Sequence, residues 1–189
     1  SVRARRLLPP EFALPIDGQP LTPLVVLAMR CQGIAIDDNT ARPGIIVQVG
    51  LVIAPPDGTG DVNSFTLWHF TTHPRLARRL RDAGLSVQLV PTIAYEVALG
   101  GKLHSMQVTV PAPAQPAFDL CGSISEPSQP LALTGNWWAK GSKGLVKQAS
   151  QVPAGLVGEA QLTLTTAADS PLGQLIDGAS FSFPVLQRF

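Results

Sequence analysis

Apolar and polar positions alternate on both sides of one short helical pattern in the middle of the chain. From Ser64 to Thr71, small or polar residues alternate with apolar ones, as in a half-buried strand. His73-Pro74 ends this run, and Arg75–Ala83 has the apolar spacing of a helix. Gly84 follows at the position where the end of a helix often needs a left-handed residue. The pattern therefore predicts a strand, a helix and a left-handed turn in that order.

The other β-rich runs are short, and glycine and proline separate them. Ile45–Ile53 differs from the rest because its apolar residues occupy both faces, which is typical of a central, buried strand. The remaining runs are Leu24–Met29, Ser86–Leu99, Leu103–Pro111, Ala117–Cys121, Pro130–Trp138, Gly144–Val152, Leu156–Thr166 and Ala179–Leu186. Further short helices are expected over Val2–Leu8 and Asp169–Leu175. Many strands with few helices predict a β-sandwich or a closed barrel, and no boundary is evident within a single domain of residues 1–189.

Composition indicates an unusually apolar interior. Hydrophobic residues make up 45% of the chain and charged residues only 14%, against about 25% in typical soluble domains. The longest apolar region, Ile45–Ala54, is interrupted by Gln48 and Gly50 and is shorter than the ~18 residues that a membrane-spanning helix needs. We therefore expect a soluble protein without a membrane span and with an apolar core or cavity. The sequence does not indicate a compartment.

Charge and residue spacing exclude several classes of partner. The net charge of +1 provides no basic field for nucleic acid, and the arginines of Arg75–Arg81 favour a solvated helix face over an anion site. The three histidines lack metal-ligand spacing and no nucleotide-binding motif is present, so we expect neither a metal nor a cofactor. Cys31 and Cys121 lack a zinc or redox spacing. We expect two buried thiols, and a disulfide between them is the alternative that the sequence leaves open.

The order of elements resembles the acetoacetate decarboxylase family over most of the chain. The resemblance rests on the patterns in Leu24–Met29, Phe65–Tyr95, the glycines before Leu103, Trp138 with Gly141 and Gly144, and Ser170-Pro171-Leu172. It implies a mostly β fold with a few short helices, in which antiparallel strands form a closed, cone-like β-barrel. It also implies an apolar central cavity, in agreement with the composition.

The residues that carry the chemistry of this family are missing. The resemblance implies decarboxylation of a β-keto acid through a Schiff base on a lysine, whose pKa is depressed by desolvation and neighbouring positive charge. The matching stretch Asp82–Val87 contains no lysine, and Val25 and Thr40–Arg42 stand where the family has its carboxylates. We therefore expect the fold of the family without its Schiff-base decarboxylation.

Glu96 and His104 are the candidate catalytic residues. Glu96 alternates with small and polar residues; facing a barrel interior it would be a carboxylate of raised pKa, and facing outward an ordinary surface acid. His104 alternates with apolar residues, which fits either a cavity acid or base or a hydrogen-bonded structural histidine. A hairpin turn at Gly100-Gly101 is expected to bring the two residues nearly opposite each other, so that both face inward or both face outward.

Tryptophans are the candidate ligand-binding residues. Trp68 and His69 lie on opposite faces of one strand, so only one of the two can point inward. Trp137 and Trp138 also lie on opposite faces of one strand. One ring is expected to pack in the core or cavity wall, and the other is expected to be left unpacked as an outlier. We expect Trp68 or Trp137 in the wall of the cavity.

Two functions of different classes stay open. One is a lysine-independent isomerase, cyclase, dehydratase or lyase that acts on an apolar carbonyl-type small molecule. The other is a non-catalytic barrel that binds a hydrophobic small molecule. A plainer alternative is assembly through an exposed tryptophan and the arginine helix, and a homo-oligomer also stays open. Two or more convergent ionisable groups in the cavity would favour catalysis, whereas an almost purely apolar lining would favour binding.

Overall fold

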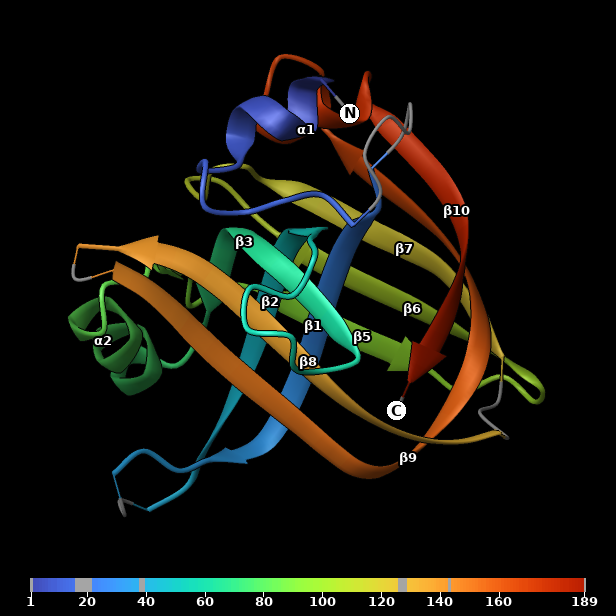
Figure 1. Ribbon diagram of the computed structural model, residues 1–189. Helices are drawn as coiled ribbons and strands as arrows, with labels where there is room; N and C mark the ends of the chain where they lie inside the picture. Colours follow the sequence, from blue (N-terminus) through green and yellow to red (C-terminus); the bar gives the residue numbers. More distant parts are fainter. Residues whose placement is uncertain (1, 16–21, 38–39, 126–128, 143, 189) are drawn as a thin grey trace. The chain divides into compact units, whose positions relative to one another are not determined.

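The computed structural model describes residues 2–15, 22–37, 40–125, 129–142 and 144–188 (Figure 1). Strands account for 53% of the chain, and the described residues contain three short helices. The expectation of a mostly β protein with a few short helices is therefore confirmed. No helix is long and apolar enough to cross a membrane among these residues.

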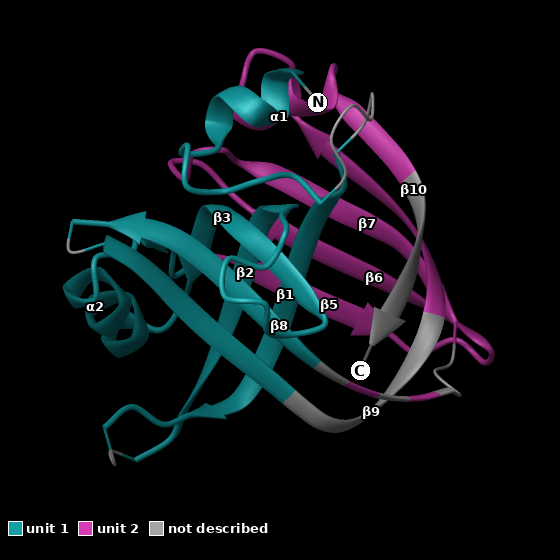
Figure 2. Ribbon diagram, viewed as in Figure 1, with its two compact units in different colours: residues 1–91, 133–151 teal, residues 92–132, 152–189 magenta. Residues whose placement is uncertain are grey.

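The chain forms two compact units (Figure 2). Unit 1 consists of Ser1–Pro91 and Leu133–Gln151, and unit 2 consists of Thr92–Ala132 and Val152–Phe189. Two long strands, β8 (Gln129–Gly141) and β9 (Gly144–Thr166), belong partly to each unit. The prediction of a single domain stays a prediction, and the two units are described separately below.

Unit 1 is built around one central strand. β2 (Arg42–Val52) lies between β1 (Leu24–Ile34) and β3 (Val62–Thr71), and both pairings are antiparallel. On its other side β3 pairs in parallel with β8 and with the short β4 (Gln88–Leu89). Every residue of β2 from 46 to 51 is buried. The prediction of a central strand over Ile45–Ile53 is therefore confirmed.

The helices of unit 1 begin and end where their sequence signals stand. α1 is Val2–Leu7 and α2 is Pro74–Asp82. The Nδ1 atom of His73 accepts a hydrogen bond from the backbone N–H of Leu76 at 3.1 Å, which caps the start of α2. Gly84 follows the helix with a φ of +89°, the conformation that its sequence position predicted. A small apolar cluster holds α2 against the rest of the unit: Ala77, Leu85, Val87 and Ala139.

Unit 2 contains an antiparallel run of strands with one helix. The order is β5 (Ala94–Ala98), β6 (Leu103–Val110), β7 (Phe118–Ser125), the last part of β9 and β10 (Ser180–Arg188). Directly paired apolar residues form rows on one face, as in Val108–Leu120–Leu164. Ser170 caps α3 (Pro171–Ile176), close to the predicted position. The buried face of unit 2 thus follows from simple alternation.

Two predicted segments differ from the structure. The run Ser86–Leu99 divides into β4 and β5, because Pro91 lacks the N–H that a continuing ladder needs and begins a turn. The runs Gly144–Val152 and Leu156–Thr166 merge into the single strand β9.

The strand pairings of the described ranges do not close into a ring. The mostly β class is therefore established, whereas the closed, cone-like barrel is not observed. The acetoacetate decarboxylase-like form of the fold stays a prediction.

Candidate functional site

The predicted pairing of Glu96 with His104 is wrong. Glu96 on β5 lies opposite Gln107 on β6, and the neighbouring pairs are Val97 with Met106 and Ala98 with Ser105. This register is shifted by three residues from the expected one, because the hairpin turn lies later in the sequence than Gly100-Gly101. An odd shift moves one residue of a pair to the other face of the sheet. Glu96 and His104 therefore lie on opposite faces and form no catalytic pair.

Each of these two residues has a simple structural environment. The Glu96 side chain is exposed on the polar face of unit 2, beside a concavity of about 230 Å³ that Gln107 and Cys121 also line. His104 is half-buried, and its Nδ1 accepts a hydrogen bond from the Gly100 N–H at 3.2 Å, which stabilises the hairpin turn. Of the alternatives that the sequence left open, His104 therefore fits the hydrogen-bonded structural histidine and Glu96 fits the ordinary surface acid.

Both rings of the Trp137-Trp138 pair are buried, so the predicted outlier is wrong. The Trp138 Nε1–H donates to Asn63 Oδ1 at 2.8 Å, and the Lys147 ammonium lies 5.4 Å from the Trp138 ring centroid. The Trp137 ring packs over Gly50 of β2, where an added Cβ would lie 2.8 Å from the ring. β8 is therefore covered on both of its faces, which leaves no free surface for either ring.

Unit 1 contains a polar cluster that consists of the buried Gln48 and His69 and the half-buried Gln148. Gln48 and His69 face each other on β2 and β3, and each side chain is only 1% exposed. The Nε2 atom of Gln48 lies 3.3 Å from His69 Nδ1, and the same atom donates to Gln148 Oε1 at 3.3 Å. None of the hydrogen bonds within the cluster involves a charged partner. The polar cluster is therefore an uncharged group on a sheet face that also carries the buried side chain of Thr71, next to His69 on β3.

Two polar atoms of the cluster have no hydrogen-bond partner within the part of the chain that the structure describes: His69 Nε2 and Gln48 Oε1. Burial lowers the pKa of His69 to about 4, so its imidazole is neutral at pH 7. A fully buried polar atom without a partner is rare in folded proteins. The polar cluster is therefore the strongest candidate for a ligand contact in this molecule.

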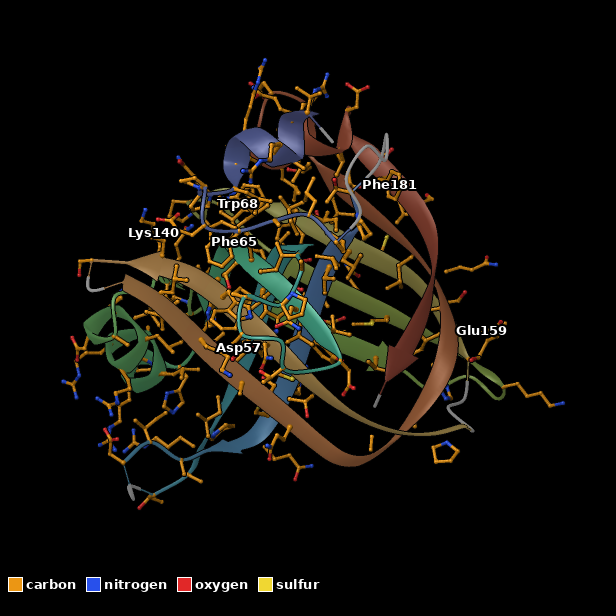
Figure 3. All side chains as sticks on the ribbon, viewed as in Figure 1. Asp57, Phe65, Trp68, Lys140, Glu159 and Phe181 are labelled. Carbon is orange, nitrogen blue, oxygen red and sulfur yellow. The ribbon has the colours of Figure 1, made fainter. Side chains whose placement is uncertain are left out.

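Apolar side chains of β1 border the polar cluster on the same sheet face. The β1–β2 register pairs Leu27 with Gln48, with Val25 and Met29 two positions to either side. These three β1 side chains are only half-buried, and Trp137 lies on the same face through its contact with Gly50. The cluster thus has apolar neighbours on β1 and β8, whereas its neighbour on β3 is Thr71. Trp68 occupies the other face of β3, near Phe65 (Figure 3).

The cluster was not singled out from the sequence, although two signals pointed to it. Gln48 interrupts the most apolar run of the chain, and His69 lies in the neighbouring predicted strand. Their contact depends on the β2–β3 register, which includes a bulge between Val49 and Gly50. Gln148 comes from a distant strand, and nothing in the sequence relates it to the other two.

The remaining candidate groups lie outside the cluster. His73 Nε2 is also buried without a partner among the described residues, but the ring is held as the cap of α2. Lys140 pairs with Glu11, and Lys147 with Asp57, so neither amine is part of the cluster. Cys31 and Cys121 are free, as expected, but neither is buried: Cys31 is half-buried, and Cys121 is exposed on the polar face of unit 2. No group of three metal-ligating side chains occurs in the described ranges.

Comparison with known proteins gives no match to a family model, to a curated protein or to a solved structure.

Proposed function

We propose that this protein binds a small, uncharged and mainly apolar molecule, and that Gln48 and His69 supply the polar contacts. The observation that carries the proposal is the pair of buried atoms, His69 Nε2 and Gln48 Oε1, which no described residue satisfies. An unsatisfied buried polar atom costs about 1–3 kcal/mol. A ligand that pairs with these atoms would recover this cost.

Charge supports an uncharged ligand. The imidazole of His69 is neutral at pH 7, because burial lowers its pKa to about 4. The hydrogen bonds of the cluster link it to no charged side chain. An ionic ligand group placed here would lose its hydration without gaining an opposite charge. The half-buried side chains of Val25, Leu27 and Met29 would instead contact the apolar part of the molecule.

Binding is favoured over catalysis because ionisable groups do not converge. Glu96 is exposed and lies on the opposite sheet face from His104, and His69 is the one ionisable side chain in the polar cluster. A lysine-independent enzyme would need a second group to accept or return a proton. The acetoacetate decarboxylase-like barrel remains part of this proposal. The strand–helix–strand order of β3, α2 and β4 and the mostly β composition support it.

The test is binding of uncharged medium-chain compounds, with 1-octanol and 2-octanone as probes. We expect a rise in Tm and a change in tryptophan fluorescence, because Trp137 lies on the face of the polar cluster. His69→Leu should weaken binding about tenfold, the loss of one buried hydrogen bond. His104→Leu is the matched control and should leave the affinity unchanged, since His104 contacts the hairpin turn of unit 2.

Two results would contradict the proposal. One is the absence of any Tm rise with either probe. The other is weakened binding in His104→Leu or Glu96→Gln while His69→Leu binds normally. That result would place the binding site at Glu96 and His104, the candidate residues of the sequence analysis.

A further inference from the structure

The hydrogen bonds of the polar cluster define which atoms donate and which accept. An amide nitrogen carries two N–H groups, and Gln48 Nε2 has two acceptors at 3.3 Å, His69 Nδ1 and Gln148 Oε1. Each N–H is therefore donated to one of them. Because Nδ1 of His69 accepts, the proton of the neutral imidazole lies on Nε2.

The two atoms left over are thus of opposite kinds. His69 Nε2–H is a donor without an acceptor, and Gln48 Oε1 is an acceptor without a donor. They belong to side chains that lie directly opposite each other on β2 and β3 and share one face of the sheet. A ligand group that reaches both atoms would therefore meet one donor and one acceptor.

We infer that the site selects uncharged ligands whose polar group both donates and accepts hydrogen bonds, such as an alcohol or a primary amide. This inference rests on the proposed function and names the chemical class of its ligand. A ketone, ester or ether can accept from His69 Nε2–H, but it leaves Gln48 Oε1 buried without a donor. Sites built to pair with a hydroxyl discriminate against analogues that lack it, because their own polar groups then stay unpaired.

The experiment compares an alcohol with its methyl ether, which differ in one hydrogen-bond donor. Affinities of 1-octanol and methyl octyl ether for the wild-type protein are measured by titration calorimetry. We expect the alcohol to bind about tenfold more tightly. Gln48→Leu should abolish this selectivity, because it removes the acceptor. Gln107→Leu, on the polar face of β6 in unit 2, is the matched control and should retain it.

The outcomes separate the two proposals. Equal affinities for the alcohol and the ether, with both bound, would overturn the selectivity and leave the proposed function standing. A selectivity that Gln48→Leu leaves unchanged would also overturn it. Absence of binding by both compounds would overturn the proposed function and the inference together. The wild-type comparison is decisive even if a variant does not fold.

Discussion

Unit 1 buries polar side chains on both faces of its sheet, and the two groups differ in how completely they are satisfied. On one face, Asn63 accepts from the Trp138 Nε1–H at 2.8 Å and from the Asn136 amide at 3.2 Å. The amides of Asn63 and Asn136 in turn donate to the Thr59 carbonyl. These side chains leave no buried atom without a partner in the described residues. On the other face, Gln48 and His69 each leave one buried polar atom without a hydrogen-bond partner in the described residues.

The satisfied group, which we call the asparagine network, has an evident structural role. It ties the loop between β2 and β3, where Asp57 lies (Figure 3), to the strand β8. The Lys147 ammonium adds an ion pair with Asp57 at 2.6 Å. The polar cluster holds no loop in place: its contact between Gln48 and His69 joins strands that already pair along their backbones, and its contact between Gln48 and Gln148 links β2 to β9. The contrast is the basis of our proposal that the network serves the fold and the cluster a ligand, because of these two groups only the cluster has buried polar atoms without a partner in the described residues.

The largest expected effect is the loss of the asparagine network. Asn63→Ala removes the acceptor of two buried donors, Trp138 Nε1–H and the Asn136 amide, and should lower the free energy of unfolding by about 2–4 kcal/mol. Urea denaturation followed by circular dichroism measures this loss. Gln161→Ala, at an exposed position of β9, is the control and should change stability by less than about 0.5 kcal/mol. A loss below about 1 kcal/mol for Asn63→Ala would show that the network is not a stabilising element.

An intermediate effect is expected from pH, and it concerns the polar cluster alone. The pKa of His69 falls from its ordinary value of 6.5 to about 4 because of burial. Between these values the unfolded chain binds a proton that the folded protein does not. The contribution of His69 to the free energy of unfolding should therefore be complete well above pH 6.5 and decrease as the pH falls toward 4. The decrease should reach roughly 2–3 kcal/mol by pH 4.5.

The matched variant for this pH dependence is His69→Phe, in which the decrease between pH 6.5 and 4.5 should disappear. The pKa of the Asp57 carboxyl is about 2, lowered chiefly by the hydrogen bond from Lys147, so the contribution of that carboxyl is lost only below this window. Denaturant midpoints measured at half-unit pH steps provide the comparison. Identical slopes in the wild type and the variant would place the titration elsewhere in the chain.

The elements of the fold could be predicted because they depend on local periodicity and caps. The apolar faces of Ile45–Ile53 and the signals of His73-Pro74 and Gly84 act within a few residues of the chain. The register of the β5–β6 hairpin could not be predicted from the sequence. One residue more or less in its glycine turn moves every side chain of a strand to the other face of the sheet. The predicted pairing of Glu96 with His104 was therefore wrong because it assumed a different hairpin register.

The polar cluster could not be predicted for a related reason. Gln48 and His69 meet through the β2–β3 register, which a bulge shifts, and Gln148 joins them from a strand far along the chain. The sequence marks Gln48 only as a polar interruption in an apolar strand. Such an interruption in a strand buried on both faces is a usable signal, because burying an amide is unfavourable unless it has a partner.

The smallest stability effect is expected where the cluster is removed as a whole. The double variant Gln48→Leu with His69→Phe replaces both facing side chains by apolar ones of similar size and eliminates both unsatisfied atoms. Replacement of both partners of a buried hydrogen bond can be nearly neutral or stabilising, in contrast to the removal of one. We therefore expect the free energy of unfolding to stay within about 1 kcal/mol of the wild type, while binding of 1-octanol is lost.

This result would complete the comparison, since the asparagine network should show the opposite behaviour. A polar group retained for the fold is costly to remove, whereas one retained for a ligand is costly to keep. Urea denaturation of the double variant and of Asn63→Ala under the same conditions measures both terms. If the double variant is the less stable of the two, Gln48 and His69 hold β2 and β3 together, and the cluster is a structural element like the network on the opposite face.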